Sequence, residues 1–370
     1  MRLLFAIKTL ALPGGGTERV VADLASALAG RGHDVTVFSF DPSDRAPFYP
    51  FMPTVRRQGL GIGDVGRGTR PVEAARRALA LRREVKALRP MVAVGFMHSA
   101  YIPLGLALLG TGIPLVASEH IAYDHYRTRR LEAALLKLTP RLAEAITIIS
   151  PSIRDGFPPA IRRRMTVVPN PVAAQDPRRA DVAGAALPFK TLLAVGRLEA
   201  QKDHKTLIDA FARIADRFSD WQLRIVGEGS LRSHLEERIA RLGLIERVEL
   251  AGATAQVDDE YVRAQLFAMP SSYESFGLTT AEALSHGLPV IGFADCPGTN
   301  ELVKDGVNGL LVDGGDRAHS LAEGLARLMA SAEERIRLGA AGPASIDAFA
   351  PERIVDLWEK LLGRIARASE

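Results

Sequence analysis

Short apolar runs alternate with amphipathic segments along the first half of the chain. The runs that predict buried strands lie at residues 2–8, 35–40, 91–96, 114–118, 145–149 and 165–168. Between the first two runs, apolar side chains recur at helical spacing and Gly30 follows them, which predicts a helix over residues 17–29. This alternation is typical of a parallel sheet that helices cover on both faces.

The same alternation begins again in the second half. Predicted strands lie at residues 191–195, 222–226, 248–250, 266–270 and 288–292, and predicted helices at 206–218, 231–242, 258–264 and 280–285. Pro169-Asn170-Pro171 separates the halves, and the small, polar, proline-bearing residues 173–188 have the composition of a linker. We therefore predict an α/β protein with two doubly wound, Rossmann-like domains, over residues 1–170 and 171–350.

Residues 91–118 carry no Asp, Glu, Lys or Arg, and these 28 residues are long enough to cross a bilayer. They also contain Pro103, Pro114 and four glycines, which favours a strand, a helix over residues 102–109, a turn and a second strand. We favour this interpretation over a membrane span, because a parallel sheet buried on both faces is equally apolar.

Composition supports a soluble protein with more than one core. A chain of 370 residues is too long for one ordinary domain, and 47% hydrophobic with 24% charged residues is typical of globular proteins. The single cysteine, Cys296, excludes an intrachain disulfide, suits a reducing compartment and is interpreted as structural. We expect no signal peptide, because Lys8 interrupts the first apolar run.

Charge is distributed unevenly between the halves. Residues 1–170 carry 24 Lys and Arg against 13 Asp and Glu, whereas the other residues carry 23 against 30. A basic half indicates contact with an anionic surface, for which nucleic acid and anionic lipid are the candidates. Residues 56–89 are the most basic stretch, and their amphipathic second part predicts either a solvated outer helix or one that lies on a membrane.

Two features of the first half suggest ligand contacts at the carboxyl ends of strands. Pro13 and three glycines follow the first strand, where backbone N–H groups can approach a ligand, although a tight turn explains them equally well. Ser118-Glu119-His120 ends a later strand, and His98 ends the strand before it. The alternative for each histidine is a hydrogen-bonded structural role.

The second half contains an informative stretch at residues 271–292. Glu274 and Glu282 stand on either side of a predicted helix N-terminus, where an anion is favoured. Two acids beside an anion suit a sugar nucleotide, whose hydroxyls need acceptors while its phosphates need donors. The alternative is that Thr279 and Glu282 form a capping box that only satisfies the helix backbone.

Two cations stand on another predicted loop of the second half. Arg197 and Lys202 are five residues apart between a strand and its helix, where they suit a diphosphate. In a doubly wound sheet this loop and the loop with the two glutamates open on the same edge. We therefore expect two cations and two carboxylates to face one crevice between the domains.

These motifs together resemble a known family. GRLEAQK is similar to the G-R-L-x-x-x-K element, and ESFGLTTAE to the E-x7-E element, of retaining GT-B glycosyltransferases of family 4. GGGTERV, SEH, VVPNPV, IVGEGSLR and DCPGTNELVKDGVNGLLV occur in the family's order, so the resemblance covers essentially the whole chain. It implies a GT-B fold whose last segment, from Pro351, crosses back to the first domain.

The resemblance implies a hexosyltransferase that moves a hexose or N-acetylhexosamine with retention, forming an α-glycosidic bond. Its implied catalytic residues are Arg197, Lys202, Glu274 and His120. Its implied donor-nucleotide residues are Gly15, Gly16, Gly196, Arg197, Lys202, Ala253, Gly277, Leu278, Thr279 and Glu282. Glu282 would bind the ribose, Glu274 and His120 would bind the donor sugar, and the leaving phosphate would take the acceptor's proton without a covalent nucleophile.

We expect no cofactor and no metal, because the chain has no Asp-x-Asp and the paired cations replace a divalent ion. A UDP-sugar is favoured over a GDP-sugar as co-substrate. The basic domain would hold a lipid-linked saccharide, lipid or polysaccharide acceptor, with His98, Arg127 and Arg129 on the acceptor side. We expect a cytoplasmic protein, peripheral on the anionic inner face of a bacterial plasma membrane, that binds no nucleic acid.

Two other functions fit the same residues. A nucleotide-sugar hydrolase or epimerase on the same fold would consume donor without an acceptor. A non-catalytic protein that binds anionic surfaces would need the basic half but not the paired cations and carboxylates.

Overall fold

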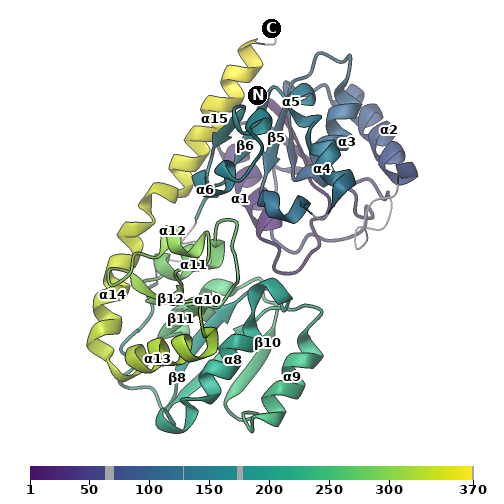
Figure 1. Cartoon of the computed structure of the whole chain (residues 1–370). Coiled ribbons are helices and arrows are strands. Elements are labelled where there is room, and N and C mark those ends of the chain that lie inside the picture. The colour runs from purple at the N-terminus through teal and green to yellow at the C-terminus, as the bar shows by residue number, and fades with distance from the viewer. Residues whose placement is uncertain (63–70, 128, 173–177, 369–370) are drawn as a thin grey trace. The chain divides into compact units, whose positions relative to one another are not determined.

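The computed structural model describes residues 1–62, 71–127, 129–172 and 178–368. Residues 63–70 of the basic stretch and residues 173–177 of the predicted linker lie outside them. Contacts divide the chain into two compact units (Figure 1). The first unit is Met1–Pro171 with Pro351–Glu370, and the second is Val172–Ala350.

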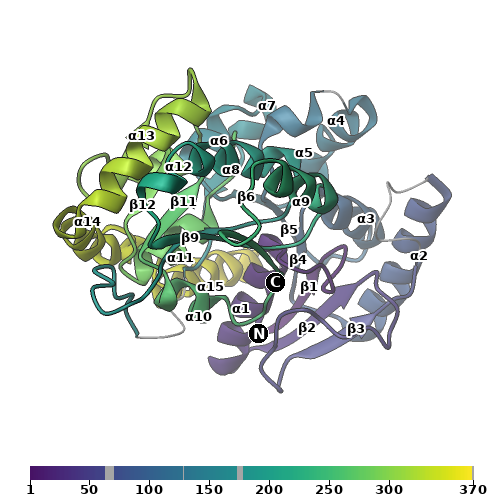
Figure 2. The same ribbon diagram turned by 90° about the horizontal axis from the view of Figure 1, so that it is seen from below.

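The first unit contains a sheet of seven parallel strands in the order β3-β2-β1-β4-β5-β6-β7. The strands are β1 (Arg2–Ala6), β2 (Asp34–Ser39), β3 (Arg56–Gly59), β4 (Val92–Phe96), β5 (Leu115–Glu119), β6 (Ala145–Ile148) and β7 (Met165–Val167). Figure 2 shows β2 and β3 following β1 toward one edge, with β4 on the other side of β1. The strand order therefore reverses between β1 and β4, which is where open α/β sheets bind ligands.

Helices surround this sheet. The longer ones are α1 (Gly16–Gly30), α2 (Pro71–Leu88), α3 (His98–Leu108) and α15 (Pro351–Ala368), and the shorter ones are η1 (Tyr123–Tyr126), α4 (Arg130–Leu136), α5 (Thr139–Leu142), α6 (Pro151–Asp155) and α7 (Pro159–Arg162). β4 and β5 are buried along their whole length, as a sheet covered on both faces requires.

The last helix, α15, completes the hydrophobic core of the first unit. Its apolar face, which includes Trp358 and Leu362, is buried in the same cluster as Phe5 of β1 and Phe96 of β4. On the polar face of α15, Asp356 and Glu359 each accept a 2.6 Å hydrogen bond from Arg31. Burying each large apolar side chain contributes about 1.5–3 kcal/mol, so the helix is an integral part of this unit.

The second unit contains six parallel strands in the order β10-β9-β8-β11-β12-β13. They are β8 (Lys190–Val195), β9 (Trp221–Val226), β10 (Val248–Gly252), β11 (Leu266–Met269), β12 (Val290–Phe293) and β13 (Gly309–Val312). Its helices are α8 (His204–Ala212), α9 (Arg232–Arg241), α10 (Val257–Arg263), α11 (Leu278–Ser285), α12 (Thr299–Leu302), α13 (Arg317–Ala330) and α14 (Ala332–Ser345), with the turns η2 (Ala200–Lys202), η3 (Ala215–Arg217) and η4 (Asp347–Phe349). The predicted α/β class with two doubly wound sheets is confirmed.

Several predicted elements differ from the structure. β3 was not predicted, because its sequence is polar and it pairs with β2 alone at the edge of the sheet. The helix predicted over residues 206–218 ends at Ala212, and η3 follows it. The helix predicted over residues 102–109 begins at His98, so His98 opens a helix rather than ending a strand.

The uncharged residues 91–118 form β4, α3 and β5. Within the described ranges, no helix is both long enough and apolar enough to span a bilayer. The alternative of a membrane span at this stretch is therefore wrong.

Candidate functional site

The site in the second unit is built on the loop between β8 and α8, which contains Gly196, Arg197 and Lys202. Glycines in the next loop allow two backbones to touch: a Cβ at Gly227 would lie 2.0 Å from the carbonyl oxygen of Gly196, and Gly227 has φ +153°. Glu199 accepts hydrogen bonds from the backbone N–H and the hydroxyl of Ser230, at 3.1 and 2.9 Å. The IVGEGS segment thus holds the GRLEAQK loop in place.

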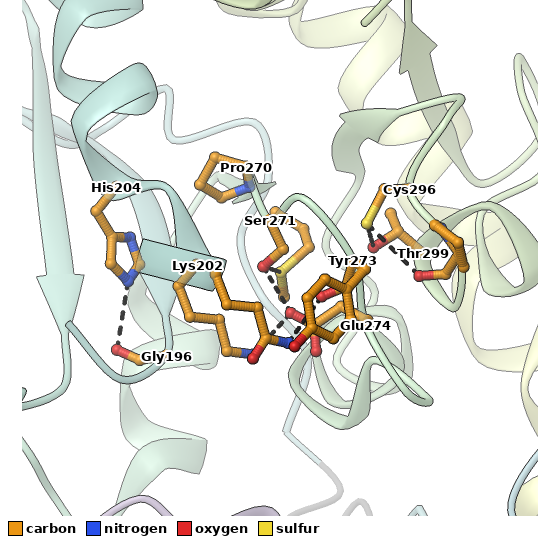
Figure 3. A network of polar contacts seen from close by, with 12 residues as sticks. Gly196, Lys202, His204, Pro270, Ser271, Tyr273, Glu274, Cys296 and Thr299 are labelled. Atoms are coloured by element: carbon orange, nitrogen blue, oxygen red, sulfur yellow. Dashed lines mark hydrogen bonds and ion pairs between the residues drawn. The ribbon is translucent and has the colours of Figure 1, made fainter. Parts of the chain in front are cut away.

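Lys202 and Glu274 form a direct ion pair. Lys202 Nζ lies 2.7 Å from Glu274 Oε1, and the hydroxyl of Ser271 donates a 2.5 Å hydrogen bond to the same oxygen (Figure 3). The side chains of Lys202 and Glu274 are only 15% and 8% exposed. The structure therefore brings together one cation and one carboxylate that the sequence predicts on separate loops of one edge.

Arg197 differs from Lys202 because its side chain is exposed. Across the residues that the structure describes, its guanidinium makes no ion pair. The pKa of the nearby Glu199 carboxyl is lowered chiefly by the Ser230 N–H; burial opposes this, and the charge of Arg197 adds to the lowering. A positive charge is thus presented to solvent at the carboxyl end of β8, where an anionic ligand can reach it.

Glu282 is buried, with 3% of its surface exposed, and its Oε2 accepts a 2.7 Å hydrogen bond from the hydroxyl of Tyr261. The helix that carries it, α11, begins at Leu278 after Gly277, which has φ +81° and provides no side-chain cap. Thr279 therefore lies inside the helix, and the capping box is wrong. Glu282 is the fifth helical residue, two positions further along the helix than predicted.

Three residues around Glu282 were not identified from the sequence. The ring of Tyr261 stacks on the imidazole of His286, with ring centroids 5.2 Å apart. His286 Nδ1 lies 2.9 Å from the carbonyl oxygen of Glu282, and its Nε2 lies 3.5 Å from Asp258 Oδ1. No motif joins positions 258, 261 and 286, because only the packing of α10 against α11 brings them together.

Arg317, at the start of α13, tethers the Glu274 loop and was also missed. It donates hydrogen bonds to the carbonyl oxygens of Pro270 (2.8 Å) and Ser271 (2.9 Å). It also pairs with Asp203 at 3.4 Å, next to Lys202 in the chain, and its guanidinium lies 3.6 Å from the ring centre of Phe293. One side chain therefore contacts both loops that supply the Lys202–Glu274 pair.

The Cys-Pro-Gly segment packs against the backbone of Glu274. The N–H of Glu274 donates to the carbonyl oxygen of Pro297, and a Cβ at Gly298 would lie 2.5 Å from the carbonyl oxygen of Glu274. Gly298 also has φ +79°, a conformation that favours glycine. Cys296 is fully buried, burial raises the pKa of its thiol, and it contacts Thr299 (Figure 3). The structural interpretation of Cys296 agrees with this burial.

His204 contacts the backbone of the loop that contains Arg197. Its Nε2 lies 3.4 Å from the carbonyl oxygen of Gly196, and the side chain is almost fully buried. Burial, followed by the charge of Lys202, lowers the pKa of His204 to about 4, so the imidazole is neutral at pH 7. A neutral imidazole here adds no charge to the two cations above it.

The first unit holds the other predicted donor residues. Gly15 precedes α1, and a Cβ there would lie 2.1 Å from Glu18 Oε2, so the glutamate folds back against the glycine. The backbone N–H of Gly15 donates to the carbonyl oxygen of Leu12, and Gly16 is the first residue of the helix. His120 is buried, and its Nε2 lies 3.0 Å from the hydroxyl oxygen of Ser118. Burial lowers the pKa of His120 to about 4.

The predicted acceptor residues do not all meet. His98 Nε2 and Arg129 Nη1 both approach the carboxylate of Glu132, at 3.4 and 3.2 Å. Arg127 instead pairs with Asp124 on the surface. The remaining predicted residues are partly exposed at loops of the second unit: Ala253 follows β10, and Leu278 and Thr279 open α11. Within the described ranges, no cluster of three or more His, Cys, Asp or Glu side chains is arranged to hold a metal ion.

Two family models match the chain. The model of Glycosyl transferases group 1 covers residues 179–345, and the model of Glycosyltransferase Family 4 covers residues 14–176. The amylovoran biosynthesis glycosyltransferase AmsD of Erwinia amylovora is 27% identical over 94% of this chain and 96% of its own. The GalNAc-alpha-(1->4)-GalNAc-alpha-(1->3)-diNAcBac-PP-undecaprenol alpha-1,4-N-acetyl-D-galactosaminyltransferase of Campylobacter jejuni is 24% identical over the whole of both chains.

An exopolysaccharide phosphotransferase from Streptomyces coelicolor is 26% identical over 94% of this chain, which spans only 39% of that protein's length. Among solved structures, sucrose-phosphate synthase from Thermosynechococcus elongatus superimposes with a TM-score of 0.82 at 22% identity and full coverage of both chains. HepE from Anabaena, solved in complex with UDP-glucose, has a TM-score of 0.79 at 20% identity and covers 98% of this chain and 100% of its own. These two likenesses concern the fold.

Proposed function

Because the chain belongs to the family 4 glycosyltransferases of GT-B fold, we propose that it is a retaining hexosyltransferase. It would move a hexose or N-acetylhexosamine from a nucleoside diphosphate sugar to a hydroxyl of a lipid-linked or polysaccharide acceptor, with an α-glycosidic product. The observation that carries this proposal is the meeting of Lys202 and Glu274 beside the exposed Arg197, at the carboxyl ends of β8 and β11.

The proposed chemistry uses these residues to bind and to stabilise charge. The bond between the anomeric carbon and the diphosphate oxygen breaks while the acceptor oxygen bonds to the same face of the sugar. The acceptor proton passes to the leaving phosphate. Arg197 and Lys202 would stabilise the negative charge that grows on the diphosphate, a contribution of about 2.7–4 kcal/mol for one well-placed donor.

The two carboxylates would bind hydroxyls. Glu274 would accept from the donor sugar and Glu282 from the ribose, each with its carboxylate already oriented by a protein hydroxyl, from Ser271 and Tyr261 respectively. Lys202 neutralises Glu274 and thereby reduces repulsion between that carboxylate and an incoming diphosphate. Gly15, Gly16, Gly196, Ala253, and Gly277, Leu278 and Thr279 at the start of α11 complete the proposed nucleotide contacts.

We propose a UDP-sugar as donor, a metal-independent reaction, and no cofactor. HepE, which has the same fold, was solved with UDP-glucose, and this supports uridine as the base. The sequence has two basic side chains on one loop, Arg197 and Lys202, and it has no Asp-x-Asp motif. This supports neutralisation of the diphosphate charge by the protein alone.

The acceptor would bind the basic first unit, with His120 near the donor sugar. The Campylobacter relative is named for a transfer to an undecaprenol-diphosphate-linked saccharide, which supports a lipid-linked acceptor here. Helix α2 exposes Arg76, Arg83 and Lys86 together with the apolar Val72 and Leu79, which are 66% and 70% exposed. A face of this kind suits an anionic membrane surface, so we propose a peripheral protein on the cytoplasmic face of the plasma membrane.

The test is transfer from a panel of UDP- and GDP-sugars to polyprenyl-diphosphate saccharides, with detergent-solubilised substrate and product separated by chromatography. Lys202→Ala and Glu282→Ala should each lower turnover by roughly a hundredfold or more. Lys205→Ala is the matched control, because Lys205 is half exposed and pairs with Asp209 of its own helix. Unchanged turnover in both site variants would overturn the site assignment.

The same assay separates the alternatives. Donor consumption without a glycosylated product would identify a hydrolase or epimerase. Salt-sensitive binding to anionic vesicles, with no shift in melting temperature by any nucleotide, would identify a non-catalytic surface-binding protein. A thermal-shift panel also names the base, because the nucleotide that binds best stabilises most.

A further inference from the structure

The buried carboxylate of Glu119 in the first unit determines where His98 carries its proton. His98 has no role in the reaction proposed above. Glu119, the last residue of β5, is 1% exposed and accepts four hydrogen bonds. The backbone N–H groups of His120 and Ile121 donate to Oε1 at 2.9 and 3.0 Å. The hydroxyls of Tyr101 and Tyr126 donate to Oε2 at 2.7 and 2.9 Å.

These four donors fix the charge of Glu119. An ionised carboxylate offers about four lone-pair sites, and here a donor occupies each one, an arrangement that favours the ionised form. Burial raises the pKa of Glu119 and the four hydrogen bonds oppose that rise. Burial also raises the pKa of Tyr126 far above its usual range, so Tyr126 keeps its proton.

The single proton of Tyr126 then determines the tautomer of His98. The hydroxyl oxygen of Tyr126 lies 2.8 Å from His98 Nδ1 as well as 2.9 Å from Glu119 Oε2. Because the hydroxyl proton points to the carboxylate, the bond to His98 must use an N–H of the imidazole as donor. Burial lowers the pKa of His98 to about 4, so at pH 7 the imidazole carries one proton; that proton is on Nδ1, and Nε2 is an acceptor.

The other side of His98 faces Glu132, whose Oε2 also has His125 Nε2 at 3.8 Å, beyond hydrogen-bond distance. His98 Nε2 lies 3.4 Å from Glu132 Oε2, an oxygen that is buried and has no hydrogen-bond partner in the part of the chain that the structure describes. The second oxygen, Oε1, already accepts from Arg129 at 3.2 Å. Two acceptor atoms thus face each other, an arrangement that is stable when a hydroxyl of another molecule donates to them.

The backbone adds an independent sign that His98 is placed for a function. Met97, directly before it, has φ +66° and ψ 154°, which a residue with a side chain rarely adopts. Such strain persists where the surrounding structure enforces it. It turns the chain sharply from β4 into α3, so that His98 begins the helix beside Tyr126.

We propose that Glu119 and Tyr126 are positioning residues that hold His98 as the Nδ1–H tautomer, so that His98 Nε2 and Glu132 Oε2 accept hydrogen bonds from adjacent hydroxyls of the acceptor saccharide. The inference rests on the proposed function for the identity of the ligand, whereas the tautomer does not depend on it. His98 here binds and orients; the acceptor proton still passes to the leaving phosphate.

The first experiment measures the tautomer in the full chain at pH 7, by ¹⁵N–¹H correlation of histidine-labelled protein, with His98→Gln to assign the signal. We expect a protonated Nδ1 and an unprotonated Nε2 in the wild type, and a switch to Nε2–H in Tyr126→Phe. Tyr123→Phe is the matched control: it lies on the same turn, and the structure gives its hydroxyl no hydrogen bond within the described residues. A wild-type His98 that is Nε2–H or doubly protonated, or a spectrum unchanged by Tyr126→Phe, overturns the inference.

The second experiment tests the ligand. Methyl α-glycosides of glucose, galactose and their 2-acetamido derivatives, at tens of millimolar, should shift the His98 Nε2 signal in the wild type and do so at roughly tenfold higher concentration in Glu132→Gln. No shift with any glycoside overturns the saccharide assignment even when the tautomer is as expected. With active enzyme, Tyr126→Phe should raise the acceptor KM about tenfold and leave the donor KM unchanged. An inactive wild type would count against the proposed function alone, because the spectra need no turnover.

Discussion

The hydroxyl of Tyr261 donates a 2.7 Å hydrogen bond to Glu282 Oε2, and both side chains are buried. The carboxylate that we propose for ribose recognition therefore has its orientation set from behind. A hydrogen bond to an ionised group contributes about 1.5–3 kcal/mol, so this contact is large enough to matter for binding.

Tyr261→Phe should weaken UDP binding roughly tenfold or more while leaving the fold intact, because only one oxygen atom is removed. Isothermal titration of UDP measures this directly. In a double-mutant cycle with Glu282→Ala, the two losses should be less than additive, since both remove the same bond. Fully additive losses would show that Tyr261 acts elsewhere.

Removing Lys202 should destabilise the second unit. Lys202→Met leaves the Glu274 carboxylate buried, with the Ser271 hydroxyl as its remaining side-chain partner among the described residues. Breaking a buried pair in this way costs about 3–5 kcal/mol. The double variant Lys202→Met with Glu274→Gln should recover most of that loss, although neither protein should transfer sugar. Urea unfolding followed by tryptophan fluorescence tests this, because Trp221 is in the core of this unit. Equal stability of the single and double variants would contradict it.

Arg317 should be required for activity as well as stability. Arg317→Met keeps an apolar stem over Phe293 but loses the hydrogen bonds to Pro270 and Ser271, so we expect a loss of roughly 2–3 kcal/mol and a lower kcat/KM. Arg327→Met is the control, because Arg327 is exposed and pairs with Glu334 on the surface. If both variants behave alike in unfolding and kinetic assays, the tether has no special role.

The stability of the second unit should depend on pH through His204. Its pKa is lowered from 6.5 to about 4 in the folded state, so the unfolded chain binds the extra proton between these values. The free energy of unfolding is therefore highest above pH 6.5 and falls by up to about 3 kcal/mol as the pH drops to 4.

Urea midpoints between pH 4 and 7.5 check the His204 prediction. His204→Gln keeps an amide N–H near the carbonyl oxygen of Gly196 but does not titrate, so its pH profile should be flatter than that of the wild type. A wild-type profile as flat as that of the variant would mean that His204 does not contribute.

The sequence motifs were sufficient for the fold class and for the family. The strands were predictable because both faces of each central strand are buried, which leaves uninterrupted apolar runs such as residues 92–96. The edge strand β3 is the exception: its RRQG sequence shows no such run, since only one neighbour pairs with it. Where burial is one-sided or absent, composition carries little information about strands.

The site was predictable only in part, for a related reason. Lys202 and Glu274 lie on motifs whose loops share one sheet edge, so topology alone brings them close. Tyr261 and Arg317 act through side chains that cross between elements, and no spacing in the sequence records such contacts. The capping box at Thr279 failed because α11 begins at Leu278, two residues earlier than predicted. It follows Gly277, whose left-handed conformation the sequence pattern does not reveal.

Helix α15 has a consequence for how the protein is made. The first unit needs Trp358 and Leu362 to close its core, yet these residues are synthesised only after the entire second unit. The second unit is one continuous segment and can fold as soon as it leaves the ribosome, whereas the part of the chain made first must wait with an incomplete core. The first unit is thus the first to be synthesised and the last to complete its core. In the interval it is the part of the chain that is most exposed to aggregation and to chaperones.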